Sequence, residues 1–176
     1  LGIKILSLHP MQTFGKYRED IFDGIFWGCD CTADDFSIAE SIIADLGGIG
    51  RLLDEKILRN KPLYHAIGVS VANFLQGVVE FARLQCESIS LQPSEVLLPI
   101  LRTSFENAYS AIEQGSDVPI TGPVARGDAE RIRVHLESLK KHSEYANEYT
   151  LLTQFLASIL QKQGKISNDA YQKLMI

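Results

Sequence analysis

The sequence predicts a mainly α-helical protein that opens with a small α/β segment. Over the first part of the chain, short runs rich in Ile, Leu and aromatic residues alternate with turn residues, which is typical of strands around a single helix. From residue 57 onward, apolar residues recur at helical spacing in long segments that Gly, Pro and Ser separate. We therefore expect two domains, an α/β part over residues 1–56 and a helical part over residues 57–176.

The α/β part is predicted to follow the order strand, strand, helix, strand. The first strand, "IKILSLHPM", should end at His9-Pro10, because proline lacks the donor that a sheet needs. Asp34 and Asp35 favour a helix start, and Gly47-Gly48 supply its end. The four elements correspond to residues 3–11, 24–32, 33–48 and 49–55.

The helical part is predicted to begin with one long helix over residues 62–87. This segment carries few charges before Glu80 and Arg83, and a helix that is apolar nearly all round is normally buried on several sides. We expect burial in a helical bundle or in a subunit interface. Further helices are predicted over residues 91–115 with a kink or break at Pro99, over 127–142 with Asp128 as N-cap, over 145–164, and after Ser167 as cap.

The composition is that of a mildly acidic chain with a sizeable core. Apolar residues make up 45% of the 176 residues and the formal net charge is −5, which argues against general affinity for nucleic acid. No membrane span or secretory leader is predicted. Three cysteines, an odd and low number, are typical of a reducing cytoplasm. Because the chain begins with Leu and enters a strand at once, we expect it to be a piece of a longer protein.

Cys29 and Cys31 form a C-x-C pair in the second predicted strand. Two ligands without a second pair are a weak signal for zinc, so no metal site is predicted. Residues two apart on a strand point to the same face, and shared burial is therefore the favoured interpretation.

His9 lies where the first strand gives way to a loop, close to Gln12. In open α/β sheets, ligands bind beyond the carboxyl ends of strands, so this imidazole could donate to a substrate oxygen or protonate it. A histidine that only closes the strand and fixes the loop explains the same stretch equally well.

Tyr64, His65 and Asn73 interrupt the apolar run "YHAIGVSVANFLQG". His65 and Asn73 are eight residues apart and form one stripe of a helix, so they could straddle a ligand carbonyl or amide. Structural hydrogen bonding is the commoner role of such residues. Small residues in the segment, among them Ala72 and Gly77, would admit a close neighbour and favour a dimer or bundle partner.

Thr121, Arg126 and Asp128 belong to the densest motif, "PITGPVARGDAERIRVHLESL". A turn is predicted at Thr121-Gly122-Pro123, and Asp128 leads into a helix whose N-terminus offers free N–H groups. Arg126 beside it could hold a carboxylate or a phosphate. Alternatively, Asp128 is only a cap and Arg126 pairs with an acid across an interface.

A glycine-rich phosphate loop is not found in the sequence. "GGIG", residues 47–50, follows a helix instead of joining a strand to one. A serine nucleophile elbow and an H-E-x-x-H zinc motif are also missing from the sequence. Catalysis would therefore need a cofactor site that this sequence does not contain.

Three segments, "SLHPMQTF", "YHAIGVSVANFL" and "TGPVARGDAERIRVHLESL", occur in an order and at spacings that resemble the C-terminal part of a family of bacterial Rossmann-like proteins. Members of that family are labelled NADP- or F420-dependent oxidoreductases, or carry a domain of unknown function. The resemblance covers most of the chain. It implies that the α/β part is the end of a Rossmann-like domain, and that the helical part is similar to the C-terminal domain of 6-phosphogluconate dehydrogenase.

In such proteins, the resemblance implies, an N-terminal half with a glycine-rich loop binds the dinucleotide, the helical domains form dimers, and the cleft between the halves holds the substrate. It implies catalytic roles for His65, Asn73 and His9. It implies substrate binding by Tyr64, Arg126, Thr121 and Asp128. Since the glycine-rich half is missing here, NADP is expected in the full-length protein and no cofactor in this chain alone.

We therefore expect the substrate-binding and dimerisation part of an NAD(P)-dependent oxidoreductase. It should form a homodimer in the cytoplasm, act on an unidentified small molecule, and show no activity alone. A non-enzymatic helical binding or assembly module of the same fold is the alternative.

Overall fold

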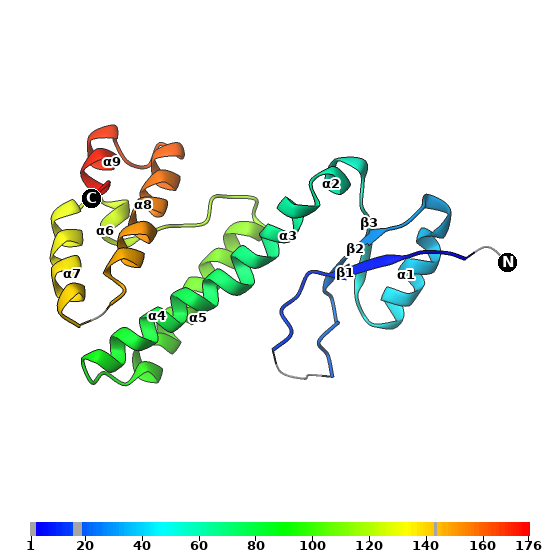
Figure 1. Cartoon of the computed structure of the whole chain (residues 1–176), viewed down its shortest axis with the longest axis horizontal. Helices are drawn as coiled ribbons and strands as arrows, with labels where there is room; N and C mark the ends of the chain where they lie inside the picture. Colours follow the sequence, from blue (N-terminus) through cyan, green and yellow to red (C-terminus); the bar gives the residue numbers. More distant parts are fainter. Residues whose placement is uncertain (1–2, 16–18, 143) are drawn as a thin grey trace. The chain divides into compact units, whose positions relative to one another are not determined.

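A computed structural model describes residues 3–15, 19–142 and 144–176 (Figure 1). It divides into two compact units, Leu1–Val78 and Val79–Ile176, which are described separately. The predicted fold class is confirmed, because a small sheet with one covering helix precedes a chain that is otherwise helical. The border between the units lies inside the long helix. The predicted functional division at residues 56 and 57 stays a prediction.

The first unit is built on a three-stranded sheet in the order β1-β2-β3. β1 is antiparallel to β2, with Ser7 opposite Asp30 and His9 opposite Gly28, whereas β2 and β3 are parallel. The predicted element order is thus confirmed, with strands shorter than predicted. The strands are β1 (Ser7–Pro10), β2 (Phe26–Asp30) and β3 (Ile49–Leu52).

One face of this sheet is covered by α1 (Phe36–Asp45), which follows the short 3₁₀ turn η1 (Ala33–Asp35) (Figure 1). Trp27 and Cys29 of β2 are buried in one cluster with residues of α1. Successive residues of a strand point to opposite faces. Gly28 and Asp30 therefore belong to the other face of the sheet.

The predicted long helix is present as three consecutive segments, α3 (Lys61–Val69), the π-helical η2 (Ser70–Phe74) and α4 (Leu75–Ser88). A short helix that the sequence did not predict, α2 (Glu55–Arg59), precedes it. The π segment was not predicted either. A π turn closes hydrogen bonds over five residues instead of four, and such turns occur often at functional sites.

Within this single chain, the long helix is not buried on several sides. Five of its apolar side chains are between 41% and 68% exposed, and they recur every three or four residues along one side. We call this set the apolar stripe: Leu63, Ile67, Val71, Phe74 and Val78. The first alternative, burial in a helical bundle, is therefore not seen for these residues in the single chain, and burial in a subunit interface stays a prediction.

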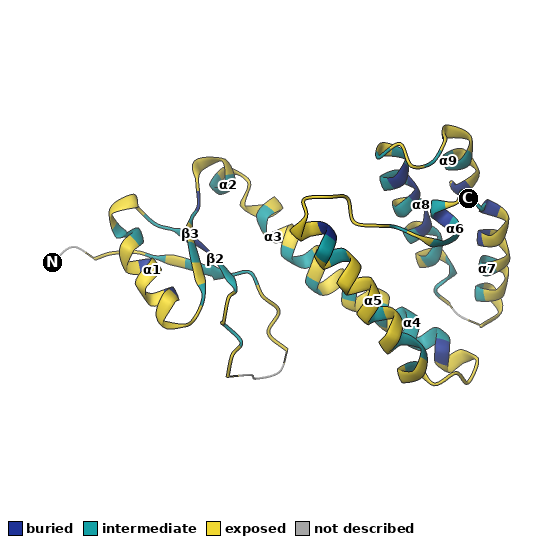
Figure 2. Ribbon diagram, turned by 180° about the vertical axis from the view of Figure 1, so that it is seen from behind, coloured by how far each residue is buried: buried dark blue, intermediate teal, exposed yellow. Residues whose placement is uncertain are grey.

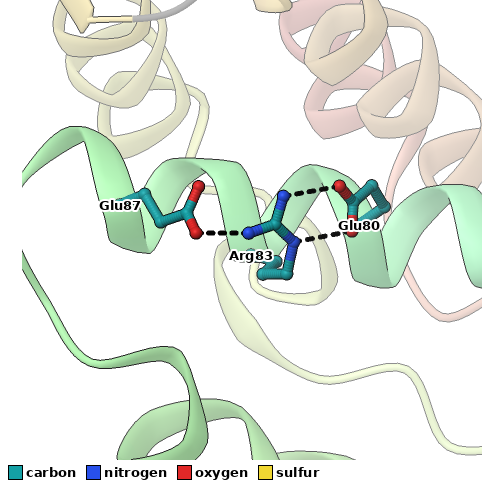
Figure 3. A network of polar contacts seen from close by, with 3 residues as sticks. All are labelled: Glu80, Arg83 and Glu87. Atoms are coloured by element: carbon teal, nitrogen blue, oxygen red, sulfur yellow. Dashed lines mark hydrogen bonds and ion pairs between the residues drawn. The ribbon is translucent and has the colours of Figure 1, made fainter.

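In the second unit, Arg83 of α4 lies between two glutamates of the same helix (Figure 3). Its guanidinium donates to both carboxylate oxygens of Glu80, at 2.7 and 2.8 Å, and also contacts Glu87. The hydrogen bonds to Glu80 raise the pKa of Arg83 and lower that of Glu80. All three side chains are exposed, so the network contributes little to stability.

The next helix, α5 (Pro93–Glu113), runs through Pro99 without interruption. The predicted break at Pro99 is therefore wrong, whereas the alternative of a kink stays a prediction. Proline removes one hydrogen bond, and in a helix of 21 residues the remaining bonds hold the turns on both sides together.

The remaining helices pack around one core, in which buried residues gather on facing sides (Figure 2). Two predicted caps are confirmed: Oδ1 of Asp128 accepts the N–H of Arg131 at 3.0 Å, and Oγ of Ser167 accepts that of Ala170 at 3.1 Å. A short helix replaces the predicted turn after Thr121. These elements are α6 (Gly122–Ala125), α7 (Ala129–His142), α8 (Ala146–Lys162) and α9 (Asn168–Leu174).

Within the described residues, no helix has the length and apolar character that crossing a bilayer requires.

Candidate functional site

The sheet face opposite α1 carries an open pocket of about 220 Å³ in the first unit. The pocket lies beside the carboxyl ends of the parallel strands β2 and β3, which is where open α/β sheets bind ligands. Its walls come from β1, from the ends of β2 and β3, and from the first turns of α3. The lining residues are Ser7, His9, Gly28, Asp30, Leu53, Lys61, Tyr64 and His65.

Three of the predicted site residues meet in this pocket. Nδ1 of His9 lies 3.3 Å from the hydroxyl of Tyr64, and the two rings meet edge to face with centroids 5.4 Å apart. The ring centroid of His65 is 6.0 Å from that of His9. The structure therefore unites residues that the sequence presented in two separate motifs, one on β1 and one on α3.

Gly28 makes room for the hydroxyl of Tyr64. A Cβ atom at Gly28 would lie 2.4 Å from that oxygen, which is closer than two such atoms can approach. Burial raises the pKa of the Tyr64 phenol, and the nearby Cys29 raises it further, whereas a hydrogen bond with the backbone of Gly28 opposes the shift. The phenol is thus protonated at neutral pH and can donate to His9.

The proton on a neutral His9 and the direction of its hydrogen bond with Tyr64 depend on each other. When Nδ1 accepts, the ring proton resides on Nε2. The second ring nitrogen of His9 is then a hydrogen-bond donor that remains available for a ligand. A donor of this kind can polarise a substrate carbonyl or hydroxyl oxygen.

The pocket also contains an ion pair between Lys61 and Asp30, which the sequence did not predict. Nζ of Lys61 lies 2.5 Å from Oδ2 of Asp30, and the two side chains are 53% and 34% exposed. Lys61 is the first residue of α3 and Asp30 is the last residue of β2. The two residues are 31 positions apart in the sequence. The available signal was the period of the strand, because Asp30 shares its face with Gly28.

Asn73 is exposed and does not line the pocket. In an α-helix, a residue eight positions after His65 overshoots two full turns by about 80°. The π segment that contains Asn73 takes more residues per turn. This winding reduces the offset and keeps Asn73 closer to the side of the helix on which His65 lies.

Thr121, Arg126 and Asp128 lie at the ends of α6 in the second unit. Thr121 and Arg126 are exposed, and Arg126 forms no ion pair with any residue that the structure describes. Asp128 is half-buried and serves as the cap of α7. The roles in substrate binding that the resemblance implies for these three residues stay predictions.

The three cysteines are free thiols. The pKa of Cys29 and of Cys31 is raised, so these two thiols ionise less readily than an ordinary cysteine. Burial raises the pKa of Cys29, and burial together with the carboxylates of Asp35 and Asp30 raises that of Cys31. Among the described parts of the chain, no three His, Cys, Asp or Glu side chains are grouped as ligands for a metal ion.

The chain matches the model of a protein family, and its fold is similar to that of a solved structure. Residues 25–155 match the family model described as "Domain of unknown function (DUF2520)". The fold is similar to the crystal structure of a "putative NADP oxidoreductase" from Bacteroides fragilis, with a TM-score of 0.68 and 24% sequence identity. The similarity covers 86% of this chain and 56% of that one, so this chain spans little more than half of that protein.

A search of curated proteins finds no match. The family match and the shared fold confirm the resemblance that the three sequence motifs predicted.

Proposed function

Because the chain belongs to the DUF2520 family, we propose that it is the substrate-binding and dimerisation part of an NADP-dependent oxidoreductase. The fold that it shares with the Bacteroides fragilis protein supports this proposal. The dinucleotide would be held by a glycine-rich half outside this sequence and would supply the hydride. The observation that carries the proposal is the pocket in which His9, Tyr64 and His65 converge.

In the proposed site, His9 and His65 hold and move the proton that accompanies hydride transfer. His9 donates from Nε2 to the substrate oxygen, and Tyr64 holds its ring in that tautomer. We further propose that Asn73 orients the substrate. For the second unit we propose separately that Arg126, which has no ion-pair partner among the described residues, attracts an acidic group, with Thr121 and Asp128 beside it. The free thiols are in keeping with the reducing cytoplasm, where we place the protein.

The apolar stripe supports a homodimer. Five exposed apolar side chains at spacings of three and four residues form the kind of seam along which two helices pack. A symmetric pair of such helices would bury the stripe of each copy against the other. The long helix is therefore the proposed dimer contact.

The test is a titration of the full-length gene product with NADPH, followed by nicotinamide fluorescence. We expect saturable binding that this chain alone does not show, and weaker binding of NADH. If the full-length product does not bind NADPH, the oxidoreductase proposal fails and the assembly module becomes the better explanation.

A further inference from the structure

We propose that the pocket of the first unit binds a small carboxylate. The inference deepens the proposed function, because it names the chemical class of the group that the substrate presents to this pocket. It starts from side chains to which the sequence gave no role, Ser7 and the Lys61–Asp30 pair, together with the two imidazoles.

The pocket offers more hydrogen-bond donors than acceptors. The ammonium of Lys61 has three N–H groups, and Asp30 engages one of them. Nε2 of His9 remains available, since Nδ1 faces Tyr64. His65 is exposed, and the hydroxyl of Ser7 is engaged by no residue in the described part of the chain. A ligand rich in acceptor oxygens fits this lining.

The charges of the pocket favour a monoanion. Lys61 and Asp30 cancel each other, and Tyr64 is uncharged at neutral pH, so the lining is neutral while both imidazoles are neutral. Uptake of one proton by His9 or His65 gives a charge of +1, which a carboxylate balances. A phosphate dianion would keep an uncompensated charge beside Asp30.

The size of the pocket agrees with a small group. Its volume of about 220 Å³ lies below the roughly 300–1,000 Å³ of pockets that hold drug-sized ligands, so the pocket suits a small group. The mouth is lined by exposed residues, among them Lys61 and His65, so a larger substrate can place its carboxylate inside and extend outward.

Binding should take up a proton. Histidine ordinarily changes charge between pH 5 and 8, and a bound anion favours the charged imidazole. Because carboxylate binding and proton uptake are coupled, the affinity of the pocket for the carboxylate increases as the pH falls. For one proton the increase is at most about tenfold per pH unit. The other titratable groups that line the pocket with the two rings are Asp30 and Lys61, which pair with each other, and Tyr64, whose raised pKa keeps it neutral over this range.

The experiment is an NMR titration of the histidine side chains of this chain with sodium acetate at constant ionic strength, at pH 6 and pH 8. The chain has four histidines. His135, which is bonded to Tyr149 at 2.8 Å, and His142 lie in the second unit and serve as internal references. We expect saturable shifts at His9 and His65 only, at least fivefold tighter at pH 6, and none with the neutral isostere acetamide.

Matched variants separate the pocket from general charge effects. Lys61→Gln should weaken acetate binding about tenfold, whereas Lys56→Gln, at an exposed lysine of α2, should leave it unchanged. The double variant Asp30→Asn with Lys61→Gln removes both charges and should regain part of the loss, because the unpaired carboxylate no longer repels the ligand.

The wild-type titration decides the inference even if a variant does not fold. Non-saturable shifts, equal shifts at all four histidines, pH-independent affinity, or tighter binding of inorganic phosphate than of acetate would each overturn it. No dinucleotide is present, so failure here is distinct from failure of the NADPH titration.

Discussion

The hydroxyl of Tyr64 lies 3.3 Å from Nδ1 of His9, although 55 residues separate the two in the sequence. The contact forms because α3 starts on the sheet face that α1 leaves open. Gly28, opposite His9 in the register, leaves the space that the phenol fills. One ring therefore sets the orientation of the other.

Removing the hydroxyl of Tyr64 tests this relationship. Tyr64→Phe keeps the ring and should lower the free energy of unfolding by about 1 kcal/mol, the usual contribution of one hydrogen bond, as measured by urea unfolding. Nitrogen NMR should show His9 losing its preference for the Nε2–H tautomer. Tyr109→Phe, at a side chain that is 70% exposed on α5, is the matched control and should change neither quantity.

Gly28→Ala tests the space beneath Tyr64. The new Cβ would lie 2.4 Å from the Tyr64 hydroxyl and 3.1 Å from Leu53, and we expect a loss of about 1–3 kcal/mol. In Gly68→Ala, the new Cβ meets only Met11, at 3.6 Å or more, so this helical site should gain about 0.5–1 kcal/mol. Thermal unfolding measures both.

The combination of Gly28→Ala with Tyr64→Phe sharpens the same test. Because the shortest contact is with the hydroxyl, its removal should recover part of the stability that Gly28→Ala loses. Strictly additive losses would show that the two residues do not share this space.

The proposed dimer contact predicts that Gly77→Leu and Ala72→Leu yield monomers in light scattering. Within the described residues, nothing lies within 4 Å of a Cβ at Gly77, so the fold itself has room for Leu and the loss would come from the interface. Ile67→Asp, on the apolar stripe, should also give monomers, whereas Gln76→Asp, at an exposed polar site, should not. Dimers that survive all three substitutions would exclude this helix as the contact.

Asp35 should slow the reaction of Cys31 with iodoacetamide. Its carboxylate contributes to the raised pKa of this thiol. Asp35→Asn therefore lowers the pKa and increases the thiolate fraction at pH 8. We expect alkylation roughly two- to tenfold faster, followed by mass spectrometry. Asp34→Asn, next to it but not among the charges that act on Cys31, should leave the rate unchanged.

The sequence predicted most of the helices and strands because their signals are local. Asp128 and Ser167 mark helix starts through their own side chains, and the structure confirms both caps. At Pro99 the sequence predicts a kink or a break, and only the break is excluded, because the loss of one hydrogen bond does not interrupt a helix of 21 residues. The π segment has no residue pattern that separates it from an α-helix.

The site could be predicted only in pieces. His9, Tyr64 and His65 were identified because polar side chains next to apolar runs are conspicuous. The sequence did not predict that these three side chains lie in one pocket, and it did not predict the Lys61–Asp30 ion pair. Both depend on how β1, β2 and α3 come together. The period of the strand shows only that Asp30 shares a face with Gly28; it does not name partners that lie 31 or 55 residues away in the sequence.

The five residues of η2 set the rotational phase of the long helix. A π turn takes one residue more than an α turn for nearly the same rotation, so deleting one residue from Ser70–Phe74 would leave an α-helical turn and keep the later side chains close to their present side. An inserted residue, in contrast, would swing every later side chain by about 100°, and Val78 would leave the side occupied by Leu63 and Ile67. Homologues should therefore lose one residue from this stretch but gain none, while the irregular residues 116–121 gain and lose residues freely.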